Sequence, residues 1–340
     1  MNIGFNEIRS AVCGAAYLEE KNGKIIFHRF TLEQETVYKT LKPGLTQINS
    51  TAGVVLSFET DSEFLKIDIC TEASTIRDFF SIDIFVNGSL NGYIDNIDAN
   101  VNFENYLEGT YTLGRFKKTF DLGSGIKKVE IHFPWSVKTV LNGIETADYS
   151  FFKPCKPEKS ILVFGDSITI GENVLRPSNR YCSAVARKIN AQEFNKAIGG
   201  EHFCPYLSEL KDSIDPDYIL VAYGTNDWAW GSKEEFINNC TSFFENLNKN
   251  YPLAQIFTLT PIWRKDYLER SSFMPFKDIK NEISDITKIY DNVFIIDGFD
   301  LIPHDEKYFS DKRLHPNDLG QKFIADGLIK FIKKVGEQYA

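Results

Sequence analysis

From residue 161 onward, short apolar runs alternate with amphipathic helical stretches. The runs cover residues 161–164, 218–223, 256–259 and 293–296. Such nearly uniform apolar runs are typical of parallel strands that helices cover on both faces. Strand–helix alternation therefore predicts a three-layer α/β domain with a parallel sheet, in which functional groups gather at the carboxyl ends of the strands.

The first 150 residues have a different texture, with many short strands and turns. In the run 64–70, apolar and polar residues alternate with the period of a half-buried strand, and Asn87-Gly88 is a tight-turn signal that joins hairpin strands. Only residues 32–41 suggest a helix. The pattern predicts an all-β jelly roll or β-sandwich. His28 and His132, each alone in an apolar strand, are interpreted as satisfied structural histidines.

A proline- and lysine-rich stretch at 153–159 is interpreted as a short linker. The sequence therefore predicts a β-sandwich accessory domain over 1–152 and an α/β domain over 153–340. A chain of 340 residues is long enough for two domains.

Charge and cysteine content narrow the class of partner. The formal net charge of −9 argues against nucleic acid or an anionic membrane surface as the main partner. The six cysteines lie far apart without Cys-x-x-Cys spacing, which indicates reduced packing residues. No basic stretch followed by an apolar core marks the first residues, so we expect a cytoplasmic protein. The sequence does not indicate the oligomeric state.

Four short motifs at strand ends form a candidate catalytic set. Ser167 follows the first strand, Gly200 lies in a glycine pair, Asn226 follows the strand at 218–223, and His315 precedes the last helix. A hydroxyl needs a base before it becomes a useful nucleophile, and developing negative charge needs fixed donors. We assign Ser167 as nucleophile, His315 as base, and Gly200, Asn226 and the N–H of Ser167 as oxyanion donors.

The ordered motifs Gly165-Asp-Ser167, Gly200, Gly224-Thr-Asn226 and His315-Pro316 resemble the four blocks of the SGNH (GDSL-type) hydrolase family. The resemblance implies a flavodoxin-like α/β fold and the site roles assigned above. The first half resembles the jelly-roll domain of two-domain carbohydrate esterases in that family. One position departs: the acid expected three residues before the histidine is Lys312, and Asp311 stands four before. Either a one-residue bulge lets Asp311 orient His315, or a backbone carbonyl does so.

The resemblance implies a serine esterase that removes small acyl groups, most plausibly O-acetyl, from a carbohydrate or related ester. A lipase, thioesterase or arylesterase is the alternative, and a catalytically inactive carbohydrate-binding protein is a third reading. Aromatic residues at strand ends suit sugar rings, so the candidate substrate-binding residues are Trp228, Trp230, Trp263 and Arg264. No cluster has metal-ligand spacing, and we expect neither a metal nor another cofactor.

Overall fold

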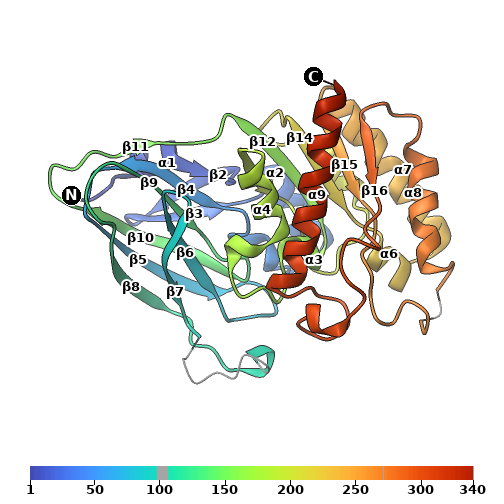
Figure 1. Ribbon diagram of the computed structural model, residues 1–340, viewed down its shortest axis with the longest axis horizontal. Coiled ribbons are helices and arrows are strands. Elements are labelled where there is room, and N and C mark those ends of the chain that lie inside the picture. The colour runs from blue at the N-terminus through green and yellow to red at the C-terminus, as the bar shows by residue number, and fades with distance from the viewer. Residues whose placement is uncertain (98–105, 271, 340) are drawn as a thin grey trace.

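The chain has two parts that lie next to each other along the long axis in Figure 1: an antiparallel β-sandwich and an α/β part. The computed structural model describes residues 1–97, 106–270 and 272–339. We propose that the domain boundary lies between residues 152 and 153. β11 (Lys153–Pro154) still pairs with β4 (Val55–Thr60) of the sandwich, so the connection follows the sandwich before it enters the α/β part.

Two sheets form the sandwich, and their apolar inner faces pack around one core. One sheet has the strand order β1-β4-β9-β6-β7, with β11 beside β4, and the other has the order β2-β3-β10-β5-β8. Alternate residues of β5 (Leu65, Ile67 and Ile69) are fully buried, as the sequence pattern predicts. Asn87 and Gly88 both have positive φ, 50° and 78°, and they join β6 to β7 in the tight hairpin expected for this pair.

The remaining elements of the first part are short. Its other strands are β1 (Val12–Cys13), β2 (Tyr17–Lys21), β3 (Lys24–His28), β5 (Phe64–Ala73), β6 (Ser81–Val86), β7 (Ser89–Asp95), β8 (Arg115–Asp121), β9 (Lys127–His132) and β10 (Val137–Thr146). Its helices are α1 (Phe5–Ala11), α2 (Leu32–Leu41), η1 (Gln47–Asn49) and η2 (Tyr106–Glu108).

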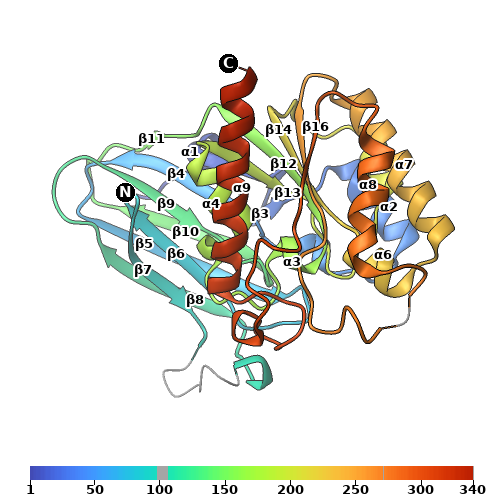
Figure 2. The same cartoon turned by 45° about the vertical axis from the view of Figure 1, so that its right-hand side comes forward.

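Five parallel strands form the sheet of the α/β part. Their order is β13-β12-β14-β15-β16, the 2-1-3-4-5 order of flavodoxin-like folds. α4 packs against α9, α7 packs against α5 and α8, and the sheet lies between these two groups (Figures 1 and 2). The predicted three-layer α/β fold after a β-sandwich is therefore confirmed.

Element bounds in this part follow the sequence pattern closely. The strands are β12 (Lys159–Gly165), β13 (Ala191–Asn195), β14 (Tyr218–Ala222), β15 (Gln255–Leu259) and β16 (Val293–Ile296). The helices are α3 (Ser167–Ile170), η3 (Pro177–Asn179), α4 (Tyr181–Lys188), α5 (Pro205–Glu209), α6 (Thr225–Trp230), α7 (Lys233–Asn250), η4 (Phe276–Asp278), α8 (Ile279–Thr287), η5 (Glu306–Tyr308) and α9 (Asp318–Tyr339). Ser232 precedes α7 as its N-cap, and its side chain and that of Glu235 form a capping box.

One segment of the first part packs on the second. Residues 29–50, between β3 and β4, carry α2 and η1, and the ring of Tyr38 in α2 packs edge-on against Tyr206 of α5. Phe30, Tyr38 and Ile48 are buried in the hydrophobic core of the α/β part and not in that of the sandwich. The helix over 32–41 was expected, but its packing against the α/β part was not.

A cavity of about 380 Å³ lies between the sandwich and α4. His132 of β9 lines this cavity, and Ala184 and Arg187 of α4 lie across from it. The His132 ring is buried, yet neither ring nitrogen has a hydrogen-bond partner among the described residues. The interpretation of His132 as a satisfied histidine is therefore wrong: its ring contacts Phe85 edge-on, and burial holds its pKa well below the usual range.

Candidate active site

Ser167 lies at the strand-to-helix turn after β12. The Asp166 side chain accepts a hydrogen bond from the Ile168 N–H at 2.9 Å and so caps α3. A side chain at Gly165 would collide with Thr169, and Gly171 ends the helix with φ of 94°. The two glycines allow a four-residue helix that holds Ser167 at the carboxyl edge of the sheet.

His315 and Asp311 complete a hydrogen-bonded chain to Ser167. The Asp311 Oδ2 atom lies 2.7 Å from His315 Nδ1, and His315 Nε2 lies 2.9 Å from Ser167 Oγ. Burial opposes ionisation of Asp311, but its hydrogen bonds with His315 and with backbone N–H groups hold its pKa well below the usual range. An ionised carboxylate only accepts, so Nδ1 carries the hydrogen and Nε2 accepts from the serine hydroxyl.

The loop of residues 309–316, named the His315 loop below, explains how an acid four residues away reaches the ring. Lys312 has φ of 56°, a left-handed conformation that absorbs one extra residue. Asp311 Oδ1 accepts from the N–H groups of Arg313, Leu314 and His315 at 2.8–3.1 Å. An antiparallel bridge between Phe309 and Pro316 closes the loop. The structure thus has the bulged arrangement, with a carboxylate and not a backbone carbonyl at Nδ1.

A second carboxylate lies near the base. Glu172 Oε1 is 3.7 Å from His315 Nε2, and the Glu172 N–H donates to the Ser167 carbonyl at 2.8 Å. Burial opposes protonation of His315, but the Asp311 hydrogen bond and the negative charges of Glu172, Asp311 and Asp166 outweigh burial and raise the pKa of His315. Sequence reasoning missed Glu172, which no motif marks.

The expected oxyanion donors Gly200 and Asn226 are linked to the Ser167 turn through contacts of neighbouring residues. Gly200 has φ of 77°, and its N–H has no hydrogen-bond partner among the described residues. The neighbouring Gly199 N–H is already donated to Gln47 Oε1 at 2.7 Å, which favours Gly200 as the donor. Asn226 Nδ2 lies 3.0 Å from the Glu201 carbonyl and 3.5 Å from Asp166 Oδ2, so its amide sits between the residues next to Gly200 and Ser167.

The arrangement has the parts that acyl transfer requires. Ser167 supplies a hydroxyl, His315 a base in the correct tautomer, and Asp311 a charge that stabilises the protonated ring. The Ser167 N–H is at the first position of α3, where a helix leaves donors unpaired. Ser167, Gly200 and Asn226 together can therefore bind an oxyanion.

Residues 163–323 match the family described as GDSL-like Lipase/Acylhydrolase. This part of the chain is a GDSL-like lipase/acylhydrolase domain. No curated protein sequence matches the chain.

Three solved structures share the fold of the GDSL-like domain and the sandwich together. The salicylyl-acyltransferase SsfX3 from a tetracycline biosynthetic pathway is 18% identical, with a TM-score of 0.80 over 96% of this chain and 94% of that one. A family two carbohydrate esterase from Cellvibrio japonicus is 18% identical, with a TM-score of 0.67 over 100% and 99%. The acetyl xylan esterase Est2A from the rumen bacterium Butyrivibrio proteoclasticus is 17% identical, with a TM-score of 0.59 over 85% and 91%.

The four expected substrate-binding residues of the GDSL-like domain lie in two different environments. Trp228 and Arg264 are only 1% and 2% exposed. The Trp228 indole donates to the Met274 carbonyl, and Arg264 pairs with Asp266 at 2.6 Å. Their side chains are thus held in the core, away from any substrate, because a position after a strand does not decide which way a side chain points.

The other two candidates differ from each other. Trp230 is 72% exposed and lines, with His202 and Asn239, a cavity of about 210 Å³. Trp263 is 8% exposed, stacks on His304 and contacts Phe309 of the His315 loop. Of the four candidates, Trp230 therefore has the most exposed ring, although the Arg270 guanidinium lies over one of its faces, 3.9 Å from the ring centroid.

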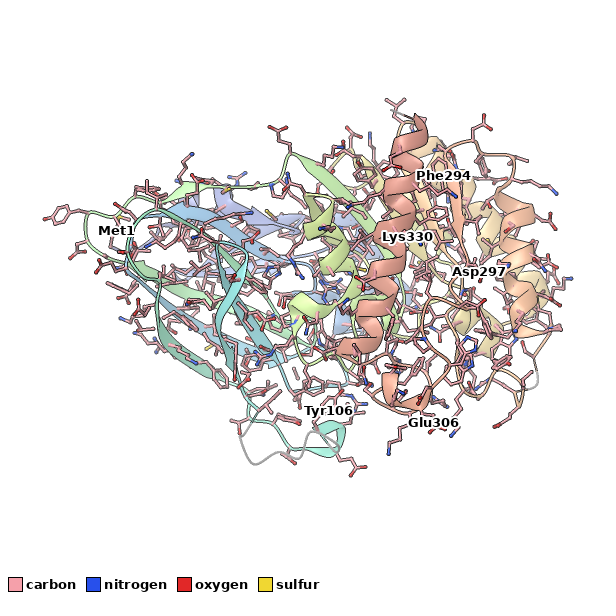
Figure 3. The ribbon with its side chains drawn as sticks, viewed as in Figure 1. Met1, Tyr106, Phe294, Asp297, Glu306 and Lys330 are labelled. Carbon is pink, nitrogen blue, oxygen red and sulfur yellow. The ribbon has the colours of Figure 1, made fainter. Side chains whose placement is uncertain are left out.

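The outer side of the His315 loop is hollowed as well. A cavity of about 800 Å³ is lined by residues that include Tyr106, Glu306 and Lys312. Tyr106 and Glu306, far apart in the sequence, both lie at the lower edge of the molecule in Figure 3. Within the described ranges, no group of three or more His, Cys, Asp or Glu side chains could hold a metal ion. No described helix is long and apolar enough to cross a membrane.

Proposed function

We propose that the protein is a serine esterase that forms an acyl-enzyme at Ser167. The observation that carries the proposal is the chain of hydrogen bonds from Asp311 through His315 to Ser167, at 2.7 and 2.9 Å. Ser167 Oγ attacks the ester carbonyl carbon while His315 Nε2 takes the hydroxyl proton. The tetrahedral oxyanion is bound by the N–H groups of Ser167 and Gly200 and by the Asn226 amide.

Collapse of this intermediate breaks the bond to the alcohol, and His315 gives the proton to the leaving oxygen. His315 then takes a proton from water, which attacks the acyl carbonyl. When this second intermediate collapses, the bond to Ser167 Oγ breaks, His315 returns the proton to Oγ, and a carboxylic acid leaves. Asp311 keeps its charge throughout and stabilises each protonated state of His315. The site residues supply every proton transfer in this scheme.

We propose O-acetyl groups on carbohydrate as the substrate class. The structural similarity to a family two carbohydrate esterase and to an acetyl xylan esterase supports this choice. The exposed Trp230 ring in a cavity with polar walls also supports it, because aromatic faces stack on sugar rings.

We also propose a cytoplasmic location, since all six cysteines are free thiols.

A second candidate function is acyl transfer to an alcohol in place of water. The similarity to a salicylyl-acyltransferase over 96% of the chain favours including it. Both reactions share the acyl-enzyme and differ only in the acceptor. Adding alcohols or sugars to an ester hydrolysis assay distinguishes them, because a transferase accumulates the new ester and an esterase releases the free acid.

The decisive experiment is the substitution Ser167→Ala with p-nitrophenyl acetate as substrate. We expect kcat to fall by roughly three to six powers of ten, because nucleophile and base act as a unit. A serine-directed phosphonate should label Ser167 in the wild type and nothing in the variant. Unchanged kcat in folded Ser167→Ala protein would reject the proposal.

Substrate class needs its own comparison. Acetylated oligosaccharides should have a higher kcat/KM than p-nitrophenyl esters of longer acids. A preference for long acyl chains would instead indicate a lipase, and a preference for thioesters a thioesterase. Binding of oligosaccharide without any hydrolysis would indicate a carbohydrate-binding protein.

A further inference from the structure

Side chains of the N-terminal part hold the loop that carries the candidate oxyanion donor Gly200. Residues 196–201, named the Gly200 loop below, follow β13 and carry the candidate donor Gly200. The 29–50 segment reaches this loop with side chains from its start, its helix and its end. Its contacts fall on both residues that flank Gly200 and on the start of the loop.

Gln47 makes the contact nearest to the donor. Its Oε1 atom accepts the Gly199 N–H at 2.7 Å, and a Cβ atom at Gly199 would lie 2.9 Å from that same oxygen. The hydrogen bond and the close approach fix the Ile198–Gly199 peptide, which is joined through the Gly199 Cα to the peptide that carries the Gly200 N–H. Because the Gly200 N–H must point at the developing oxyanion, a shift of the Ile198–Gly199 peptide would displace this donor as well.

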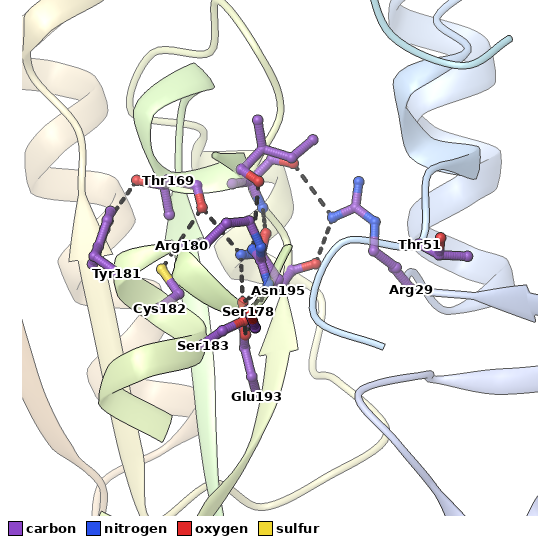
Figure 4. A network of polar contacts seen from close by, with 12 residues as sticks. Arg29, Thr51, Thr169, Ser178, Arg180, Tyr181, Cys182, Ser183, Glu193 and Asn195 are labelled. Carbon is purple, nitrogen blue, oxygen red and sulfur yellow. Dashed lines mark hydrogen bonds and ion pairs between the residues drawn. The ribbon is translucent and has the colours of Figure 1, made fainter. Parts of the chain in front are cut away.

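Arg29 ties the start of the loop to Gln47. Its fully buried guanidinium donates to the Asn195 carbonyl at 2.6 Å and the Gln47 carbonyl at 3.0 Å, and also to Ala197 and Ser50. The Lys196 ammonium donates in return to the Arg29 carbonyl. Figure 4 shows Arg29 beside Asn195, which is in turn bound to the buried pair Arg180–Glu193.

Helix α2 and Lys42, the residue directly after it, hold the far end of the loop. Tyr38 Oη donates to one Glu201 carboxylate oxygen at 3.3 Å, and Lys42 pairs with the other at 2.5 Å. The carbonyl of the same Glu201 accepts from the Asn226 amide. The 29–50 segment therefore contacts Gly199 and Glu201, the two residues that flank Gly200. Glu201 in turn binds the amide of Asn226, a second candidate donor.

We infer that Gln47 is a positioning residue for the oxyanion hole, and that the N-terminal part thereby completes the active site. This inference rests on the proposed serine esterase function. On this inference, the N-terminal part supports catalysis by positioning the Gly200 loop, without itself contacting the substrate.

The test compares Gln47→Met with Thr46→Val, using p-nitrophenyl acetate and the full chain. Methionine keeps the length of glutamine but lacks the acceptor for Gly199. We expect kcat to fall about tenfold to a hundredfold with KM nearly unchanged, because a donor displaced by about 1 Å loses mainly transition-state binding. Thr46→Val removes a hydrogen bond to Ser74 from the same turn without touching the Gly200 loop, and should keep wild-type kcat.

Tyr38→Phe is a second variant, which removes only the hydroxyl bound to Glu201. It should also lower kcat while KM stays nearly unchanged. Thermal unfolding of all variants checks that each is folded. Equal kcat in Gln47→Met and Thr46→Val, or a change confined to KM, would overturn the inference. Failure of the proposed function is distinguishable, because wild-type protein would then neither hydrolyse the ester nor react with phosphonate.

Discussion

At the scale of single residues, the sequence marks those that carry the chemistry and misses those that support them. Ser167, His315 and Asn226 lie in motifs, and the structure places His315 against Ser167 and Asn226 against the neighbouring Asp166. Gln47 and Glu172 lie in no motif, since their importance comes from contacts across the fold. Trp228 and Arg264 show the opposite error, because a residue that follows a strand can turn into the core as easily as out of it.

Asp311 is the residue whose contribution is easiest to isolate. Asp311→Asn keeps the size of the side chain but replaces an acceptor with an amide that can favour the wrong tautomer of His315. We expect kcat to fall by about three to four powers of ten. Steady-state kinetics with p-nitrophenyl acetate measures this loss, and a decrease under tenfold would contradict an orienting role for Asp311.

We expect His315 to set the pH dependence of the proposed esterase activity. A general base must be neutral to accept a proton, and the pKa of His315 is raised above the ordinary value of about 6.5. Activity should therefore be lost on acidification through a pKa above that ordinary value. Glu172→Gln removes one of the charges that raises the pKa, so the acid limb of kcat/KM should move to lower pH while the plateau at high pH changes little. An acid limb at the wild-type pH in Glu172→Gln would show that Glu172 does not act on His315.

At the scale of elements, the conformation of the His315 loop could not be predicted from the local sequence pattern. Its conformation depends on one residue, Lys312, in the left-handed region, where glycine is favoured and branched side chains are strained. The Lys312 side chain is exposed, so substitutions there act mainly through the backbone.

Lys312→Val should therefore lower kcat by roughly tenfold to a hundredfold, because the loop shifts and moves His315 away from Ser167. Lys312→Gly should keep wild-type kcat, since glycine adopts positive φ freely. Assays of both variants, with thermal unfolding as a check on folding, test this. Equal loss in both would indicate that the lysine side chain itself is needed.

Most helices and strands could be predicted because their signals are local. The apolar runs of β12 and β14, the capping box of α7 and the hairpin turn after β6 each lie within a few residues. The packing of α2 against the α/β part could not be predicted, because the residues that it contacts there lie more than 100 residues away in the sequence. The sequence pattern of α2 itself shows only that one face is apolar.

At the scale of the whole molecule, His132 lies at the cavity between the two parts. The unfolded chain protonates this histidine below about pH 6.5, whereas burial keeps the folded form neutral to lower pH. The unfolded state then binds more protons, so the free energy of unfolding should decrease as pH falls through that range, by up to about 1.4 kcal/mol per pH unit.

His132→Leu should remove this part of the pH dependence, and Phe85→Leu, which alters the ring packed against His132, should retain it. Urea unfolding of wild type and both variants between pH 7 and pH 5 measures the slopes. Parallel slopes in wild type and His132→Leu would show that the histidine is not kept neutral by the fold.

The packing of residues 29–50 also has a consequence for synthesis of the chain. Ribosomes make proteins from the N-terminus, so Phe30, Tyr38 and Ile48 emerge long before the strands and helices of the core that buries them. The sandwich can assemble around its own core while this apolar segment still faces water. Until most of the second part has emerged from the ribosome, the nascent chain exposes this apolar surface to solvent. Chaperones can bind the surface, and another incomplete chain can associate with it.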